Sequence, residues 1–282
     1  MQDGKIVPNS GSLEITYVYD NKNSKIKNVK YTLVSDAHEH VYEEEWKTTK
    51  TLHYKKCSIC GNKDQIGTHD LEDVLKEARV YKKNGKYVSK AGSINHQCSV
   101  CEKVVSKDKI PAVSVTGTKF KYSKVRYTGK RRNPEYWVRY GVGAYFQNIS
   151  PEYYTMKKAK GRLEVGKYTY TLTFKGNYKG TMKLSYKIVP DNTQITKLKG
   201  VEGGFEVSWE EQPTETTGYR IEYRKGSGKW QVEDIDDNTV TKKKITGLVR
   251  GKQYQVRVRT YKKVDDQIYT SNISKVRRVV AK

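Results

Sequence analysis

Every histidine and every cysteine of the 282-residue chain lies between His38 and Cys101. This stretch contains two close cysteine pairs, Cys57-Ser-Ile-Cys60 and Cys98-Ser-Val-Cys101, and their shared C-S-[IV]-C pattern indicates an internal repeat. A Cys-x-x-Cys turn can place two thiolates on one ion without strain, and a structural zinc ion takes four sulfur or nitrogen ligands in a tetrahedron. Metal coordination is therefore the first chemistry that these residue types predict.

The histidines complete a set of four ligands around the first cysteine pair. The expected ligands of this Cys2His2 zinc site are His40, His53, Cys57 and Cys60. Gly61 follows the pair directly and allows the tight turn of a zinc knuckle. His38 is left over, and we expect its side chain to be exposed to solvent.

A second zinc site is expected around the second cysteine pair. Its ligands would be His69, His96, Cys98 and Cys101. This set departs from the first in two ways, because Glu102 stands where the first knuckle has a glycine and because its two histidines are far apart in the sequence.

Other interpretations of these residues stay open. All four cysteines could hold one zinc ion, since paired Cys-x-x-Cys motifs recur at zinc sites. The cysteines could instead form disulfides if the chain is extracellular, and single histidines could be merely exposed. A thioredoxin-type redox role is disfavoured, because neither pair opens a helix between parallel strands.

The composition favours several small β domains over one large core. Only 35% of the residues are hydrophobic, and 23 tyrosines stand among lysines, Thr and Val, which is typical of strands. A chain of this length has room for two or three domains, and small domains bury a lower fraction of their surface. The sequence therefore predicts thin β sandwiches together with a small region that is stabilised by metal.

The formal net charge of +24 implies anionic partners. Nucleic acid is one such class, and an intracellular zinc-ribbon protein that binds nucleic acid is the alternative function that the charge suggests. The excess is mostly lysine scattered along the expected strands, where it also protects sheet edges, and no basic run is long enough for an arm. Nucleic acid is therefore disfavoured, and anionic glycans, cell-wall polymers or host surface proteins are the expected partners of a monomeric chain.

The amino-terminal residues show neither a signal peptide nor a transmembrane segment, since Met1-Gln2-Asp3-Gly4-Lys5 leads into polar residues. We therefore expect no membrane insertion. The chain would be either cytosolic or a mature form whose leader has been removed.

Alternating runs at 13–19 and 29–34 predict an amino-terminal β-hairpin, which gives a first segment of residues 1–37. The Cys/His region would follow over residues 38–109. Within it, Asn84-Gly85 predicts a hairpin turn.

The segment 70–81 carries apolar residues at helical spacing, with acidic residues near its start. These apolar residues are Leu71, Val74, Leu75 and Ala78. The pattern predicts a short helix or a single helical turn.

Residues 110–190 contain neither Cys nor His, and short alternating runs are separated there by glycines, which predicts an antiparallel Ig-like β sandwich. The expected strands are 113–115, 120–122, 136–140, 153–156, 168–174 and 182–189. The run GKYTYTLTFKGNYKG from Gly166, closing in Tyr186-Lys-Ile-Val-Pro190, together with Tyr127-Thr-Gly-Lys130, resembles a repeated β module of secreted proteins from gut Firmicutes. In those proteins the module often follows a Cys-x-x-Cys knuckle and precedes a fibronectin type III domain, and the same order recurs here.

The last segment, residues 191–282, has three runs that carry a more specific resemblance. They are Phe205-Glu-Val-Ser-Trp209, Gly218-Tyr-Arg-Ile-Glu-Tyr223 and Gly251-Lys-Gln-Tyr-Gln-Val-Arg-Val-Arg-Thr260. The segment is similar to a fibronectin type III domain. The resemblance implies a second sandwich, with Trp209 buried on one strand and Leu248 and Tyr254 in a tyrosine corner.

Two departures from such relatives bear on function. Some of them carry an Arg-Gly-Asp tripeptide in the loop where this chain has Val264-Asp265-Asp266, and no sorting motif closes the sequence. Neither integrin-type adhesion nor covalent attachment to a cell wall is therefore expected.

The sequence favours a protein without catalytic activity. It contains no Gly-x-Ser-x-Gly, His-Glu-x-x-His or phosphate-binding glycine loop, and zinc held by four protein ligands has no position left for an activated water. We expect a mainly β bacterial protein of the extracellular space or the cell surface. In it, a small zinc-knuckle region precedes two antiparallel sandwiches that act in structure, adhesion or the presentation of a ligand.

Overall fold

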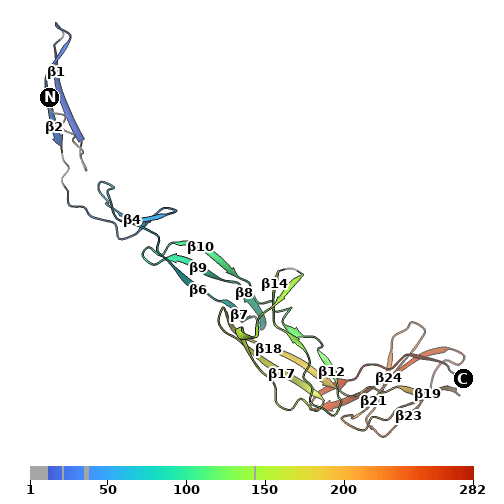
Figure 1. The fold of residues 1–282 in the computed structure, drawn as a ribbon. Helices are drawn as coiled ribbons and strands as arrows, with labels where there is room; N and C mark the ends of the chain where they lie inside the picture. Colours follow the sequence, from blue (N-terminus) through green and yellow to red (C-terminus); the bar gives the residue numbers. More distant parts are fainter. Residues whose placement is uncertain (1–11, 21, 35–37, 143) are drawn as a thin grey trace. The chain divides into compact units, whose positions relative to one another are not determined.

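The computed structural model describes residues 12–20, 22–34, 38–142 and 144–282, and the chain forms two compact units. The first unit comprises the described residues up to Val74 together with Ile94–Asp108. The second comprises Leu75–Ser93 and Lys109–Lys282. Strands make up nearly all of the regular structure (Figure 1), which confirms the expected mainly β fold class.

The first unit consists of short antiparallel pairings. A hairpin of β1 and β2 opens it, as the alternating runs predict, and two small sheets follow in the orders β3-β4-β5 and β10-β9-β6. The boundary between the two units falls within β6, β9 and β10. The strands are β1 (Ser12–Asp20), β2 (Lys25–Val34), β3 (Lys47–Thr48), β4 (Leu52–Lys56), β5 (Lys63–Thr68), β6 (Leu71–Lys76), β9 (Gly92–Cys98) and β10 (Val104–Ile110).

The helix expected over residues 70–81 is absent, and this expectation was wrong. The segment forms β6 and then β7 (Ala78–Lys83). β6 pairs with β9, and β7 lies between β8 and β18, so the backbone groups of both strands bond to residues distant in the sequence. Tertiary pairing overrides a weak local pattern in such cases.

The middle of the chain forms a mixed six-stranded sheet in the order β16-β17-β18-β7-β8, with β12 paired to β18 in addition. Two pairings are parallel, β12 with β18 and β18 with β7, and alternation along a strand could not predict their direction. The elements are β8 (Lys86–Lys90), β11 (Lys119–Phe120), β12 (Lys124–Arg126), β13 (Tyr136–Trp137), β14 (Arg139–Val142), β15 (Tyr145–Asn148), the 3-10 helix η1 (Pro151–Tyr153), β16 (Tyr154–Lys157), β17 (Gly166–Phe174) and β18 (Tyr178–Val189).

The hairpin β7–β8 turns at Asn84-Gly85, as expected, and it packs with the second unit although it precedes the second cysteine pair in the sequence. The sequence had assigned it to the Cys/His region of residues 38–109. The interval 113–115 contributes only an isolated bridge, Val113 with Tyr140, where a strand was expected.

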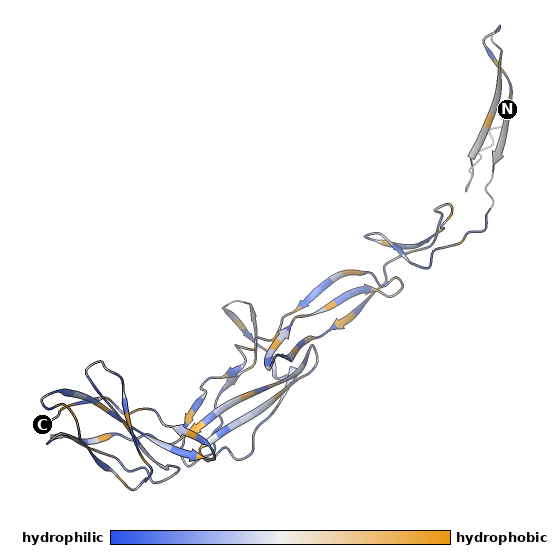
Figure 2. Ribbon diagram, turned by 180° about the vertical axis from the view of Figure 1, so that it is seen from behind, coloured by the Kyte–Doolittle hydropathy of each residue, from blue (hydrophilic) through white to orange (hydrophobic). Residues whose placement is uncertain are grey.

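The carboxy-terminal part forms two sheets, β19-β20-β23 and β22-β21-β24-β25, with β26 also paired to β24. Apolar residues alternate with polar ones along these strands (Figure 2), and the buried apolar side chains form a core around Phe205, Trp209 and Tyr219. The backbone N–H of Val249 donates to the hydroxyl of Tyr254 at 3.1 Å, as a tyrosine corner requires. The strands are β19 (Ile195–Val201), β20 (Gly204–Trp209), β21 (Gly218–Lys225), β22 (Gln231–Ile235), β23 (Lys242–Ile245), β24 (Gln253–Val264), β25 (Gln267–Thr270) and β26 (Arg277–Val280).

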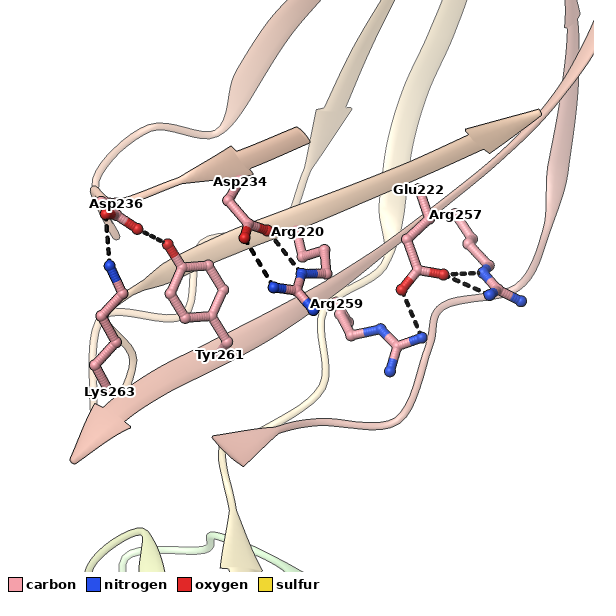
Figure 3. Close-up of polar contacts among 8 residues, drawn as sticks. All are labelled: Arg220, Glu222, Asp234, Asp236, Arg257, Arg259, Tyr261 and Lys263. Carbon is pink, nitrogen blue, oxygen red and sulfur yellow. Dashed lines mark hydrogen bonds and ion pairs between the residues drawn. The ribbon is translucent and has the colours of Figure 1, made fainter. Parts of the chain in front are cut away.

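The outer face of β22, β21 and β24 carries a row of ion pairs (Figure 3). Glu222, whose side chain is 8% exposed, accepts hydrogen bonds from Arg257 and, at 2.7 Å, from Arg259. Arg220 makes a two-point pair with Asp234 at 2.7 and 2.8 Å. Paired in this way, the charged groups can lie side by side on one face of the sheet.

Candidate metal centre

Ligand atoms from four histidines and four cysteines gather at two places in the first unit. Within each group the ligand atoms lie within 4.8 Å of one another. The first group is His38, His40, Cys57 and Cys60, and the second is His53, His69, Cys98 and Cys101.

The first group lies where the segment before β3 meets the turn after β4. Sγ of Cys57 is 3.5 Å from Nε2 of His38, and Sγ of Cys60 is 3.4 Å from Nδ1 of His40. The amide of Asn62 contacts the other ring nitrogen of His40 at 3.3 Å, which leaves Nδ1 facing the sulfur. Each cysteine sulfur therefore has a histidine nitrogen within 3.5 Å.

Backbone hydrogen bonds shape the turn that carries Cys57. Its N–H donates to the carbonyl of Asn62 at 2.7 Å, and its carbonyl accepts from the N–H of Gly61 at 3.0 Å. Gly61 has a φ of +77°, which glycine adopts without steric cost. The N–H of Ser58 donates to the carbonyl of Val41, and this bond ties the turn to the segment that carries His40.

The second turn repeats this pattern bond for bond. The N–H of Cys98 donates to Lys103 at 2.9 Å, the N–H of Glu102 donates to Cys98 at 2.9 Å, and the N–H of Ser99 donates to Asp70 at 2.9 Å. Glu102 takes a φ of +57°, so the missing glycine does not prevent the knuckle geometry. The internal repeat indicated by the C-S-[IV]-C pattern is therefore also a structural one.

The second group joins residues from both halves of the Cys/His stretch. Sγ of Cys98 lies 3.6 Å from Nδ1 of His53, and Sγ of Cys101 lies 3.5 Å from Nδ1 of His69. Nε2 of His69 is 3.2 Å from the carbonyl oxygen of Thr49, and a hydrogen bond there fixes the tautomer that leaves Nδ1 free to bind a metal.

The position of His53 depends on a glycine. His53 on β4 is in register with Gly67 on β5, and a Cβ added at Gly67 would lie 2.9 Å from Nε2 of the imidazole. The ring is 5% exposed and also meets Trp46 edge to face at a centroid distance of 4.9 Å. Gly67 therefore provides the space in which the imidazole turns Nδ1 toward Cys98.

The grouping of the histidines differs from the one expected from sequence. His53 lies with the second cysteine pair instead of the first, and His38, expected to be spare, takes its place beside Cys57. Proximity in the sequence gave the wrong grouping, because His53 lies on β4 with its side chain beside Cys98 at the end of β9 and not at the Cys57 turn. One signal could have identified His38, since it is two residues from His40 and both side chains then project to one side of an extended chain.

His96, the expected fourth ligand of the second site, lies among carboxylates instead. Its Nδ1 is 2.6 Å from Asp73 and its Nε2 is 3.3 Å from Asp108. These contacts raise the pKa of His96, with Asp73 contributing most and Asp108 next. Both ring nitrogens are therefore engaged by acceptors of the protein.

Two of the thiols are predisposed to ionise. The backbone N–H of Cys60 contributes most to lowering the pKa of Cys57 to about 5, and it acts against the effect of burial. At Cys98 burial opposes ionisation, yet the backbone N–H of Cys101 and the ring of His69 bring its pKa down to about 6. Burial raises the pKa of Cys101. Because the thiolate is the form that binds metal, one cysteine of each pair is prepared for coordination at neutral pH.

The residues present fit a tetrahedral zinc ion. Zn–S bonds of about 2.3 Å and Zn–N bonds of about 2.1 Å place sulfur and nitrogen ~3.6 Å apart in a tetrahedron. One sulfur–nitrogen separation at each cysteine is 3.4 to 3.6 Å, and all ligand atoms of a group lie within 4.8 Å of one another. The two cysteine pairs belong to separate groups, which argues against a single ion held by all four thiols, and the four cysteines are free thiols.

Comparison with known families identifies the carboxy-terminal sandwich. Residues 189–277 match the fibronectin type III domain, as the resemblance in sequence implied. No curated protein matches the chain.

Two solved structures are similar to the chain over most of its length. The structure of the FN1–FN3 domains of chicken CNTN1 is 13% identical, covers 86% of this chain and 97% of that one, and has a TM-score of 0.31. Domains A168–A170 of titin are 11% identical, cover 86% of this chain and 98% of that one, and have a TM-score of 0.27. Among the residues that the structure describes, no helix has the length and apolar character needed to cross a lipid bilayer.

Proposed function

We propose that this chain is a non-catalytic extracellular or cell-surface protein, in which two structural zinc ions hold the amino-terminal unit and β sandwiches present a binding surface. The zinc ions would be held by the two groups of four ligands described above. When bound, zinc supplies a tetrahedral cross-link between strands.

The observation that carries this proposal is the composition of the buried part of the first unit. Among its residues with described burial, the buried ones are His53, Cys57, Asn95 and Cys98. Three of these four are members of the metal-ligand groups, whereas Ile59, Ile66 and Leu71 are exposed. The residues of the unit whose burial is described form no ordinary apolar core, and metal binding can supply folding free energy on the order of 10 kcal/mol or more.

The ligand sets favour a structural role over catalysis. Each set offers four protein ligands, which fill a tetrahedral ion and leave no position for an activated water. Two thiolates also neutralise the divalent charge, so the ion would be a weak Lewis acid. The fibronectin type III domain and the resemblance of residues 166–190 to secreted modules of gut Firmicutes support a role at the bacterial cell surface.

Metal analysis of the purified chain tests this function. We expect two zinc ions per chain, and we expect a chelator to unfold the first unit while the core around Trp209 stays folded. A chain that is fully folded without metal, or that unfolds as a single unit on chelation, would contradict the proposal.

A further inference from the structure

A groove on the second unit lies where the hairpin β7–β8 meets β18. Its volume is about 540 Å³, and an adjoining cavity of about 350 Å³ shares Arg79 and Lys90 with it. The groove is lined by Arg79, Val80, Tyr81, Lys90, Lys179 and Gly180. Its size lies in the range that holds small ligands or a short stretch of a polymer.

A close backbone approach forms the floor of this groove. β7 and β18 run parallel over three residue pairs, the last of which joins Val80 to Gly180. A Cβ added at Gly180 would lie 1.9 Å from the carbonyl oxygen of Val80, and the residue has a φ of +107°. Glycine therefore allows the two strands to meet, because the backbone of Val80 occupies the place that a side chain would take.

Three cations cross the groove in a row, one on each of three adjacent strands. Arg79 on β7 is directly opposite Lys90 on β8 and directly opposite Lys179 on β18. Direct cross-strand neighbours project to the same face, and like charges in these positions destabilise a sheet. Strands are spaced about 4.8 Å apart, so the row places a positive charge roughly every 5 Å.

The surroundings strengthen this positive face. Lys83 and Lys86 form another like-charge cross-strand pair of the same hairpin, and Lys76 lines the adjoining cavity. The carboxylate that lines the adjoining cavity belongs to Glu77, which is 3.8 Å from Lys179. One carboxylate cannot neutralise the row, so the fold keeps an unfavourable arrangement of charges that an anionic ligand would relieve.

Tyr81 adds a surface that favours a sugar. Its side chain is 46% exposed and lies two residues from Arg79 on the same strand, so both project to the same face. A ring beside a row of cations can pack against the apolar face of a saccharide while the cations bind its acidic groups. Proteins that bind single-stranded nucleic acid stack successive bases on several aromatic rings, whereas the groove is lined by one.

We propose that this groove binds an anionic polysaccharide through Arg79, Lys90 and Lys179, with Tyr81 packing on a sugar ring. This inference rests on the proposed function as a ligand-presenting protein and specifies the ligand class and its site. The acidic groups could be sulfate, carboxylate or phosphate, and the probes below separate these sources.

The test measures binding of the full chain to immobilised heparin, to a polyuronate that carries only carboxylates, and to poly(glycerol phosphate). The groove variant is Arg79→Gln/Lys90→Gln/Lys179→Gln. The matched control, Lys197→Gln/Lys229→Gln/Lys252→Gln, removes the same charge from exposed positions outside the groove. At about 0.15 M salt, we expect the groove variant to bind at least one probe about tenfold or more weakly and the control to change about twofold or less.

A second pair of variants measures the contribution of the Tyr81 ring to binding. Tyr81→Ala should weaken binding, whereas Tyr145→Ala, which removes an 86% exposed tyrosine elsewhere, should not. Equal losses in groove and control variants would show that net charge alone attracts the probe and would overturn the proposal. Tighter binding of random-sequence DNA than of any glycan probe would overturn it in favour of nucleic acid. The zinc content and melting temperature of each variant show whether a loss of binding arises at the groove or from misfolding of the chain.

Discussion

Nδ1 of His53 lies 3.6 Å from Sγ of Cys98, although 45 residues separate them in the sequence. His53 is on β4 and Cys98 ends β9, so a metal ion between them would join the two small sheets of the first unit. The first ligand group, in contrast, closes only the turn after β4 onto the preceding segment. The second ion would therefore contribute more to the structure of the unit than the first.

Exchange of single histidines tests this grouping. His53→Ala should leave one zinc ion per chain and loosen the contact between β4 and β9, because it removes a ligand of the second group. His96→Ala should keep both ions, because His96 contacts Asp73 and Asp108 instead of the sulfurs. Zinc content measures both outcomes. Loss of one zinc ion in His96→Ala as well as in His53→Ala would restore the grouping expected from sequence order.

The two ions should differ in how fast a chelator removes them. Cys60 and His40 of the first group are exposed, whereas His53 and Cys98 of the second are buried. We expect excess chelator to release zinc in a fast and a slow phase of equal amplitude, measured with a chromogenic zinc indicator. His38→Ala should abolish the fast phase and His53→Ala the slow one. A single phase in the parent chain would indicate that the sites are equally accessible.

The sequence predicted those features that depend on local pattern. The alternation of Tyr254, Val256 and Val258 gave the inward face of β24, and the cysteine repeat gave two knuckles. Prediction from the sequence failed where pairing between strands distant in the sequence determines the structure. The apolar residues from Leu71 to Ala78 fit a helix as well as two strands, and only the pairing with β9 and β18 selects strands. The histidine partners likewise depend on where β4 carries His53.

Among the carboxylates of the fibronectin type III domain, neutralising Glu222 should lower the free energy of unfolding the most. It is 8% exposed and balances Arg257 and Arg259, which would otherwise repel each other. Removing one partner of a buried ion pair costs up to several kcal/mol, so we expect Glu222→Gln to lower the free energy of unfolding by about 2–3 kcal/mol. Glu206→Gln is the control, because its partner Lys199 is 50% exposed, and it should lower the free energy of unfolding much less.

Calorimetry of the full chain measures this difference. A loss of about 2 kcal/mol lowers the midpoint of the corresponding transition by roughly 8–16 °C in a domain of this size. Similar small shifts in both variants would show that the row of ion pairs contributes little to stability.

Acid should destabilise the same domain partly through Asp236. Its carboxylate accepts a hydrogen bond from Lys263 at 2.6 Å and another from the hydroxyl of Tyr261. Lys263 contributes most and Tyr261 next to lowering the pKa of Asp236. The pKa of Asp236 is lower in the folded than in the unfolded chain. The carboxylate therefore stabilises the fold at pH values above the usual aspartate pKa of about 3.9, and this contribution is lost as the pH falls through the lowered pKa.

Asp236→Asn should therefore lower the melting temperature at about pH 6, and the difference from the parent should shrink as the pH falls through the lowered pKa and the parent carboxylate is protonated as well. Asp266→Asn, in the turn between β24 and β25, removes the same charge at another position of the domain and serves as the control. Melting curves of the three proteins at a series of pH values give the comparison. A difference for Asp236→Asn that is independent of pH would mean that the amide preserves the bonds to Tyr261 and Lys263 and that the charge is not what matters.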